Sequence, residues 1–208
     1  MDFSFPEEYK QAHIEAITKD VLGGDRISLN IDNLIFKDLS PIDASSVEFR
    51  VKFSSEVLQL SATGVGIVDA LCNAFIDHFK QRFFCLETIQ FDDFALKVSL
   101  KESQKLLKAD ATAEIMLVLK TNKNKRLYFR FKSRSLVECA VEVVREAMEF
   151  LINCEQTVVT LHHIIENLEK AKRRHMIDEH VFKMAEVVQI MNFEKTINEL
   201  RCKTSKKK

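Results

Sequence analysis

The stretch that decides the fold runs from Val47 to Ile67, VEFRVKF-SS-EVLQLSA-TGVG-I. Apolar and charged side chains alternate from Val47 to Phe53, which predicts a strand with one dry face and one wet face. The segment from Val57 to Ala62 follows after a short polar turn and predicts the hairpin partner of that strand. From Ile67 to Arg82 the apolar residues recur at a spacing of three and four. That spacing predicts an amphipathic helix that covers the dry face.

The same order of patterns occurs twice in the chain. A further strand pattern at 27–36 precedes the hairpin, which makes residues 27–82 a βββα unit. Strand patterns at 89–100, 113–119 and 126–131 and a helix pattern at 136–153 repeat that order with low side-chain identity. We therefore predict an α+β fold of duplicated βββα units with pseudo-twofold symmetry, plus an N-terminal helix and two C-terminal helices.

These patterns divide the chain into four segments. We predict an N-terminal helix in residues 1–24, because Gly23 and Gly24 form a helix-ending signal. Residues 25–155 hold the duplicated units. Residues 156–203 form a helical extension whose two apolar stripes break near 176–178, and residues 204–208 form a basic tail.

The amino-acid composition argues against several classes of protein. The 208 residues are 46% hydrophobic, and 31 Lys and Arg balance 31 Asp and Glu, so no overall charge favours nucleic acid or a membrane. We expect no bilayer-spanning segment, since no apolar run approaches about 20 residues. The five cysteines are odd in number and lack a C-x-x-C pair, which favours reduced thiols and a cytoplasmic location.

The turn at Gly64-Val65-Gly66 is the first candidate site. It joins a strand to a helix, where free backbone N–H groups can bind a carboxylate or phosphate. The alternative is a tight turn without a ligand, and the motif supports the two about equally. It is not a dinucleotide fingerprint, because a third Gly and a βαβ setting are absent.

A basic strand face is the second candidate. It contains Arg126, Tyr128, Arg130, Lys132 and Arg134, which could follow a phosphate backbone. The more common explanation is a solvated sheet face neutralised by carboxylates, for which Asp93 and Glu114 are available. We do not expect nucleic acid as the principal partner.

The sequence does not predict an enzyme. It contains no P-loop, no G-x-S-x-G and no coherent Cys/His/Asp arrangement. His162 and His163 are adjacent, and His175 and His180 are five apart, so neither pair has the helical spacing of two metal ligands. We expect no catalytic residue, no metal and no cofactor.

One family shares this layout. The motif Gly64-Val65-Gly66-Ile67-Val68-Asp69-Ala70, the strand opening at 91–94 and the segment 147–153 resemble the C-terminal regulatory (dimerisation) domain of the α-isopropylmalate, citramalate and homocitrate synthase family. In that family two βββα units form the domain and the first carries a G-x-G-P-V-D-A-like turn. Ile67 stands here for the proline, and Ser133-Arg134-Ser135 for the Gly-rich turn of the second unit. The family's catalytic barrel, with its metal-binding H-x-H, is not in these residues.

The resemblance implies a non-catalytic allosteric domain. It implies a homodimer, a branched-chain amino-acid effector and a catalytic synthase domain as a possible partner. The effector's polar end would meet the backbone at Gly64, Gly66 and Val68, and its side chain would contact Leu71, Leu86, Ile89 and Phe91. The alternatives are a protein-interaction scaffold using the C-terminal helices, or a nucleic-acid adaptor using strand 126–134.

Overall fold

The computed structural model describes residues 6–39, 43–101 and 110–205, and within them it is a mixed α+β protein. Strands β1 (Leu29–Asp38), β2 (Ser45–Phe53) and β3 (Glu56–Gly64) form one antiparallel sheet in that order. Strands β4 (Gln90–Lys101), β5 (Asp110–Lys120) and β6 (Arg126–Ser133) form a second. Helix α2 (Ile67–Phe79) follows the first sheet and α3 (Leu136–Lys170) follows the second. The predicted order of three strands followed by a helix is observed in both halves.

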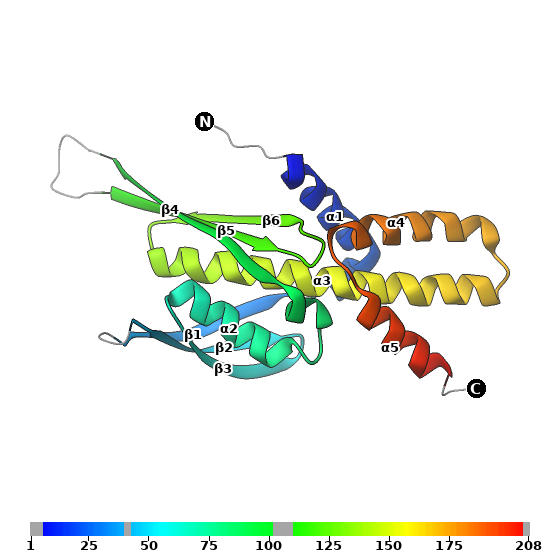
Figure 1. Ribbon diagram of the computed structural model, residues 1–208, viewed down its shortest axis with the longest axis horizontal. Helices are drawn as coiled ribbons and strands as arrows, with labels where there is room; N and C mark the ends of the chain where they lie inside the picture. The colour runs from blue at the N-terminus through cyan, green and yellow to red at the C-terminus, as the bar shows by residue number, and fades with distance from the viewer. Residues whose placement is uncertain (1–5, 40–42, 102–109, 206–208) are drawn as a thin grey trace.

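Both helices lie between the two sheets (Figure 1). α2 packs on β2 and β3, while α3 packs on β5, β6 and the start of β1. A single hydrophobic core contains buried residues from both sheets and both helices. The first unit contributes a group of phenylalanines whose neighbouring ring centroids lie 4.9–6.2 Å apart: Phe49, Phe53, Phe75, Phe79 and Phe83. Such aromatic pairs add roughly 0.5–1.5 kcal/mol each beyond the burial of their area.

The strand that decides the fold behaves as its pattern predicts. Val47, Phe49, Val51 and Phe53 are buried, and the charged residues between them are exposed. Because side chains alternate across a strand, the same residues fix the register, and a slip by one position would place the charges in the core. The dry face is the one against α2.

The predicted break after Asn153 is wrong. α3 is one helix of 35 residues, roughly 50 Å long, which crosses the predicted boundary between residues 155 and 156. Ser135 caps its start by accepting a hydrogen bond from Glu138 N at 3.2 Å. Its end is a left-handed residue, Lys172 with φ +55°, and Arg173 N donates to Leu168 O at 3.0 Å.

The helical extension also differs from the prediction. The second predicted C-terminal helix is two helices, α4 (Ile177–Ile190) and α5 (Glu194–Ser205), separated by Met191–Phe193. Asn192 makes the break, because its Oδ1 accepts from Glu194 N at 2.9 Å and its own N–H donates to Asn122 Oδ1 at 2.9 Å. Neither Gly nor Pro marks this position. Of the predicted basic tail, residues 206–208 lie outside the described residues.

The N-terminal helix α1 (Pro6–Leu22) ends just before Gly23, as predicted, and packs against α3, α4 and β6. α4 runs back along the second half of α3, and the two project away from the sheets (Figure 1). None of the helices in the described residues is both long and apolar enough to span a membrane.

Candidate ligand-binding site

The Gly64–Gly66 turn joins β3 to α2. A Cβ atom on Gly64 would fall against Ala70 N and within 2.6 Å of Asp69 Oδ2, so this position requires glycine for close packing. Gly66 is the N-cap of α2, with an extended backbone (φ −154°) and open space around it. The two glycines therefore have different roles.

The chain supplies its own carboxylate to this turn. Asp69 Oδ2 accepts a hydrogen bond from Val65 N at 2.9 Å, and Asn73 Nδ2 donates to Thr63 O at 3.0 Å. An effector carboxylate at the start of α2 would share that positive end of the helix with Asp69. These contacts favour the structural explanation of the turn.

The other predicted effector residues divide between core and surface. Val68, Leu71 and Leu86 are buried in the core, Ile89 is half-buried and Phe91 is exposed. Leu86 lies in the 3-10 segment Phe84–Thr88 that links α2 to β4. The cavity described below is lined by none of these residues.

The basic face of β6 is partly neutralised and partly covered. Arg126 Nε lies 2.6 Å from Asp92 Oδ2, and this carboxylate raises the pKa of Arg126. Asp92 thus neutralises Arg126, and the predicted Glu114 lies opposite Lys132 in the register of β5 and β6. Gln11 of α1 forms two hydrogen bonds with the Tyr128 backbone, at 2.9 and 2.8 Å. Of the other predicted residues, Arg130 is half-buried, whereas Lys132 and Arg134 are exposed.

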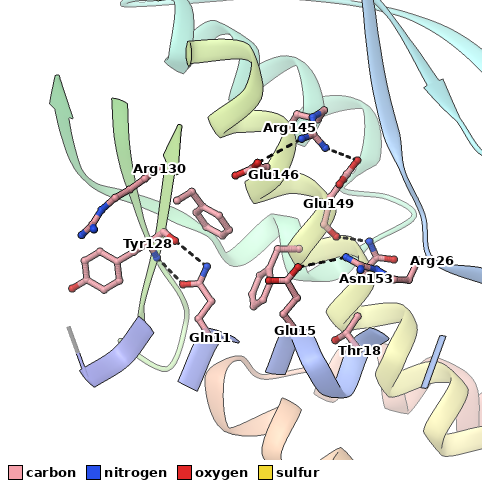
Figure 2. Close-up of a pocket in the computed structure, with 12 residues that line it drawn as sticks. Gln11, Glu15, Thr18, Arg26, Tyr128, Arg130, Arg145, Glu146, Glu149 and Asn153 are labelled. Carbon is pink, nitrogen blue, oxygen red and sulfur yellow. Dashed lines mark hydrogen bonds and ion pairs between the residues drawn. The ribbon is translucent and has the colours of Figure 1, made fainter. Parts of the chain in front are cut away.

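A cavity of about 390 Å³ lies where α1 crosses β6 and α3 (Figure 2). Its volume is within the range of small-molecule sites. Three elements and the segment before β1 line it: Gln11, Glu15, Thr18, Arg26, Tyr128, Phe129, Arg130, Arg145, Glu146, Glu149, Phe150 and Asn153.

Two residues of α3 position one side of the cavity, because they form hydrogen bonds with the backbone at the start of β1. Asn153 Oδ1 accepts from Ile27 N, and its Nδ2 donates to Ile27 O, both at 2.8 Å. Glu149 Oε1 accepts from Leu29 N at 2.5 Å. Since Arg26 directly precedes Ile27, these bonds determine where its side chain begins.

Ion pairs connect the charged residues of the cavity wall. Arg145 contacts Glu142 at 2.8 Å and Glu149 at 2.9 Å, while its distance to Glu146 is 3.6 Å. Partial burial alone would lower the pKa of Arg145, but the carboxylates of Glu142 and Glu149 outweigh it and raise that pKa. Burial raises the pKa of Glu146, assisted by nearby Glu142, Glu149 and Glu15 and opposed by Arg145. Burial therefore disfavours the charged form of Glu146.

One side of the cavity, at Phe129 and Phe150, is apolar. The rings of Phe129 and Phe150 meet edge to face with centroids 5.7 Å apart. Thr18 is buried, and its Oγ1 has no hydrogen-bond partner among the described residues. The cavity thus combines charged and apolar walls.

The sequence did not identify this cavity. Glu142, Arg145 and Glu149 form the polar side of an amphipathic helix, a pattern typical of a solvent-exposed surface. The docking of α1 onto α3 and β6 encloses Arg145 and Glu149, whereas Glu142 does not line the cavity. Asn153 carried the one available signal, as a polar residue inside an apolar stripe.

Metal-binding side chains and cysteine thiols form no alternative site in the part of the chain that the structure describes. It contains no cluster of three or more His, Cys, Asp or Glu suited to a metal ion. Four of the five free cysteines are buried, and burial raises the pKa of Cys154 to about 12. Such a thiol is a poor nucleophile at neutral pH.

Comparison with known proteins adds no assignment. No protein-family model matches the chain, and no curated protein matches it with significant sequence similarity. The resemblance to the synthase regulatory domains therefore stays a prediction.

Proposed function

We propose that this chain is a non-catalytic, cytoplasmic regulatory domain that self-associates through β4 and responds to a small amino-acid effector. Two βββα units with pseudo-twofold symmetry, as in the regulatory domain of the isopropylmalate synthase family, would supply the framework. The order of the two sheets and their helices supports this relationship. A catalytic synthase domain is the partner that the resemblance implies.

The observation that carries the proposal is the uncovered apolar face of β4. Phe94, Leu96 and Val98 pair with Leu117, Ile115 and Ala113 of β5, so they lie on the face that α3 covers further along the sheet. They are nevertheless 44%, 46% and 57% exposed. Contiguous apolar surface of this kind usually marks an interface.

A second copy of the chain fits this face best. β4 is an edge strand whose outer backbone groups can pair with another strand, once Phe94 N is released from its hydrogen bond to Asp93 Oδ1 at 2.8 Å. In an antiparallel pairing centred on Ala95, Phe94 would meet Leu96 of the other copy and Asp93 would meet Lys97. Both the apolar and the charged pairs are self-complementary, as a twofold interface requires.

Sedimentation velocity tests the proposal. We expect the wild type to form dimers, and Leu96→Asp to weaken association at least tenfold, because the twofold axis places two charges in the apolar contact. Asp93→Lys should weaken it by a smaller factor, since like charges then face each other twice. Adding Lys97→Asp to Asp93→Lys should restore the attraction and the dimer.

Three results would contradict this interface. They are a monomeric wild type at high micromolar concentration, a Leu96→Asp variant that associates normally, and a double variant no better than Asp93→Lys. Circular dichroism melting of each variant separates loss of association from loss of fold.

A scaffold using the C-terminal helices is the second candidate function. Phe182 and Val181 of α4 are exposed, although Val181 belongs to the stripe that the sequence predicts as a packing face. If Phe182→Ser abolishes self-association while Leu96→Asp does not, the interface lies on α4, and the scaffold is favoured.

A further inference from the structure

We infer that the cavity between α1, β6 and α3 binds a small zwitterion with an apolar body, such as an α-amino acid with an apolar side chain. This assignment rests on the proposed response to an amino-acid effector, and it moves the site from the Gly64–Gly66 turn to the cavity of Figure 2.

The charge of the lining selects a zwitterion over a simple anion or cation. The lining contains three arginines, Arg26, Arg130 and Arg145, and three glutamates, Glu15, Glu146 and Glu149, so it is neutral overall and offers partners of both signs. A molecule with a single charge would use partners of only one sign. A ligand with one ammonium and one carboxylate group matches both signs.

Two ion pairs of the cavity are loose enough to admit such a ligand. Arg26 Nη2 lies 3.7 Å from Glu15 Oε1, and Arg145 Nη2 lies 3.6 Å from Glu146 Oε1. Both separations exceed hydrogen-bond distance. Arg26 and Glu146 therefore keep hydrogen-bonding capacity for a ligand carboxylate and a ligand ammonium, respectively.

The close contacts of the same wall belong to the fold. Glu149 binds Arg145 at 2.9 Å and the Leu29 N–H at 2.5 Å, and Glu142 binds Arg145 at 2.8 Å. These bonds hold the α3 side of the wall in place before a ligand arrives, which reduces the entropy lost on binding.

The rest of the wall accounts for the apolar body of the ligand. Phe129 and Phe150 provide an aromatic surface, with ring centroids 5.7 Å apart. A cavity of about 390 Å³ suits a molecule of amino-acid size.

Isothermal titration calorimetry on the full chain tests the assignment, with leucine, valine and phenylalanine as zwitterions. Isocaproate, which lacks the ammonium group, and isoamylamine, which lacks the carboxylate, are the matched probes. We expect at least one amino acid to bind, and both probes to bind at least tenfold more weakly. Glu146→Gln and Arg26→Gln should each weaken binding on the order of ten- to a hundredfold, as expected for losing a hydrogen bond to a charged group.

Control variants separate the cavity from the turn and from general charge effects. Glu169→Gln on α3 and Arg50→Gln on β2 remove the same groups from exposed positions outside the cavity. Gly66→Val adds a side chain where nothing lies within 4 Å of the new Cβ. All three should bind the amino acid like the wild type.

The outcomes distinguish this inference from the proposed function. Loss of binding in Gly66→Val, with or without loss in the cavity variants, would place the effector at the turn and overturn the cavity assignment. Unchanged binding in Glu146→Gln and Arg26→Gln would overturn it as well. If no amino acid binds the wild type, the inference fails, while sedimentation still decides whether the chain self-associates through β4.

Discussion

β1 and β4 occupy equivalent positions in the two βββα units, yet only β1 has a covered end, at Leu29, while its far end at Ile35 and Phe36 is exposed like β4. Leu29 at the start of β1 is fully buried, because α3 packs on that end of the strand and binds its backbone through Glu149. Phe94 and Leu96 of β4 point to the corresponding face of their own sheet and are nearly half exposed. α2, which has 13 residues against the 35 of α3, packs on β2 and β3 instead.

This difference shows that α3 belongs to both units. Its Asn153 and Glu149 accept hydrogen bonds from the backbone at the start of β1. Its Glu155 accepts hydrogen bonds from the backbone of the segment after α2. The first unit is therefore completed by a helix from the second, whereas no described element of the first unit covers the second unit to the same extent. A second copy of the chain at β4 would supply it.

The largest expected effect comes from breaking the hold of α3 on the first unit. Glu155 is buried and accepts hydrogen bonds from Phe84 N (3.2 Å), Cys85 N (2.9 Å) and Thr196 Oγ1 (2.8 Å). Glu155→Ala leaves these donors without a partner and should lower the free energy of unfolding by about 3–4 kcal/mol. Urea denaturation measures it.

The matched control is Glu169→Ala, an exposed carboxylate near the end of the same helix. It should change the free energy of unfolding by no more than about 0.5 kcal/mol. If both variants were equally stable, Glu155 would not hold the two units together.

The second prediction compares the two strands directly. Leu29→Ala removes a fully buried side chain and should cost about 3 kcal/mol of stability, with little effect on self-association. Leu96→Ala should cost less than about 1 kcal/mol in the monomer but should weaken the dimer. Equal losses of stability, measured by urea denaturation at a concentration below the dimer dissociation constant, would mean that β4 is covered within one chain.

The sequence predicted the elements well where one pattern filled one element. The alternation from Val47 to Phe53 and the helical spacing after Ile67 both correspond to observed elements, because each element buries a face of its own. These patterns are local, so a single sequence is enough to read them.

The sequence did not predict which polar residues form hydrogen bonds with distant segments of the chain. The helix pattern was predicted to end at Asn153, but Asn153 and Glu155 lie inside α3 and bind the backbones at Ile27 and Cys85. The cavity was missed for a related reason. It forms where α1 meets β6 and α3, and no local pattern encodes that meeting.

The third prediction concerns the strand-to-helix junctions, where the first unit uses Gly64 and Gly66 and the second uses Ser133 and Ser135. Gly64→Ala should cost about 2 kcal/mol, because its Cβ would press on the backbone of α2 at Ala70. Gly66→Ser places a serine at an N-cap with an extended backbone, as Ser135 does for α3, and should leave stability unchanged or slightly raised. Thermal melting of the two variants checks the contrast. Equal destabilisation would show that the turn has no specific need for glycine at position 64.

The smallest expected effect is a pH-dependent gain of stability in Glu146→Gln. Burial raises the pKa of Glu146 in the folded state above its unfolded value, with Glu142, Glu149 and Glu15 adding to the shift and Arg145 opposing it. The folded state therefore binds the proton more tightly, so the charged carboxylate costs stability above the folded pKa. That cost disappears as the pH falls below the unfolded value of about 4.3.

Glu146→Gln removes the charge and should raise the free energy of unfolding at pH 7 by at most about 0.5 kcal/mol, because solvent screens this partly exposed group. The gain should shrink towards zero near pH 4. Urea denaturation of both proteins across this pH range measures the difference, and a gain that grows as the pH falls would reverse the assigned direction of the pKa shift.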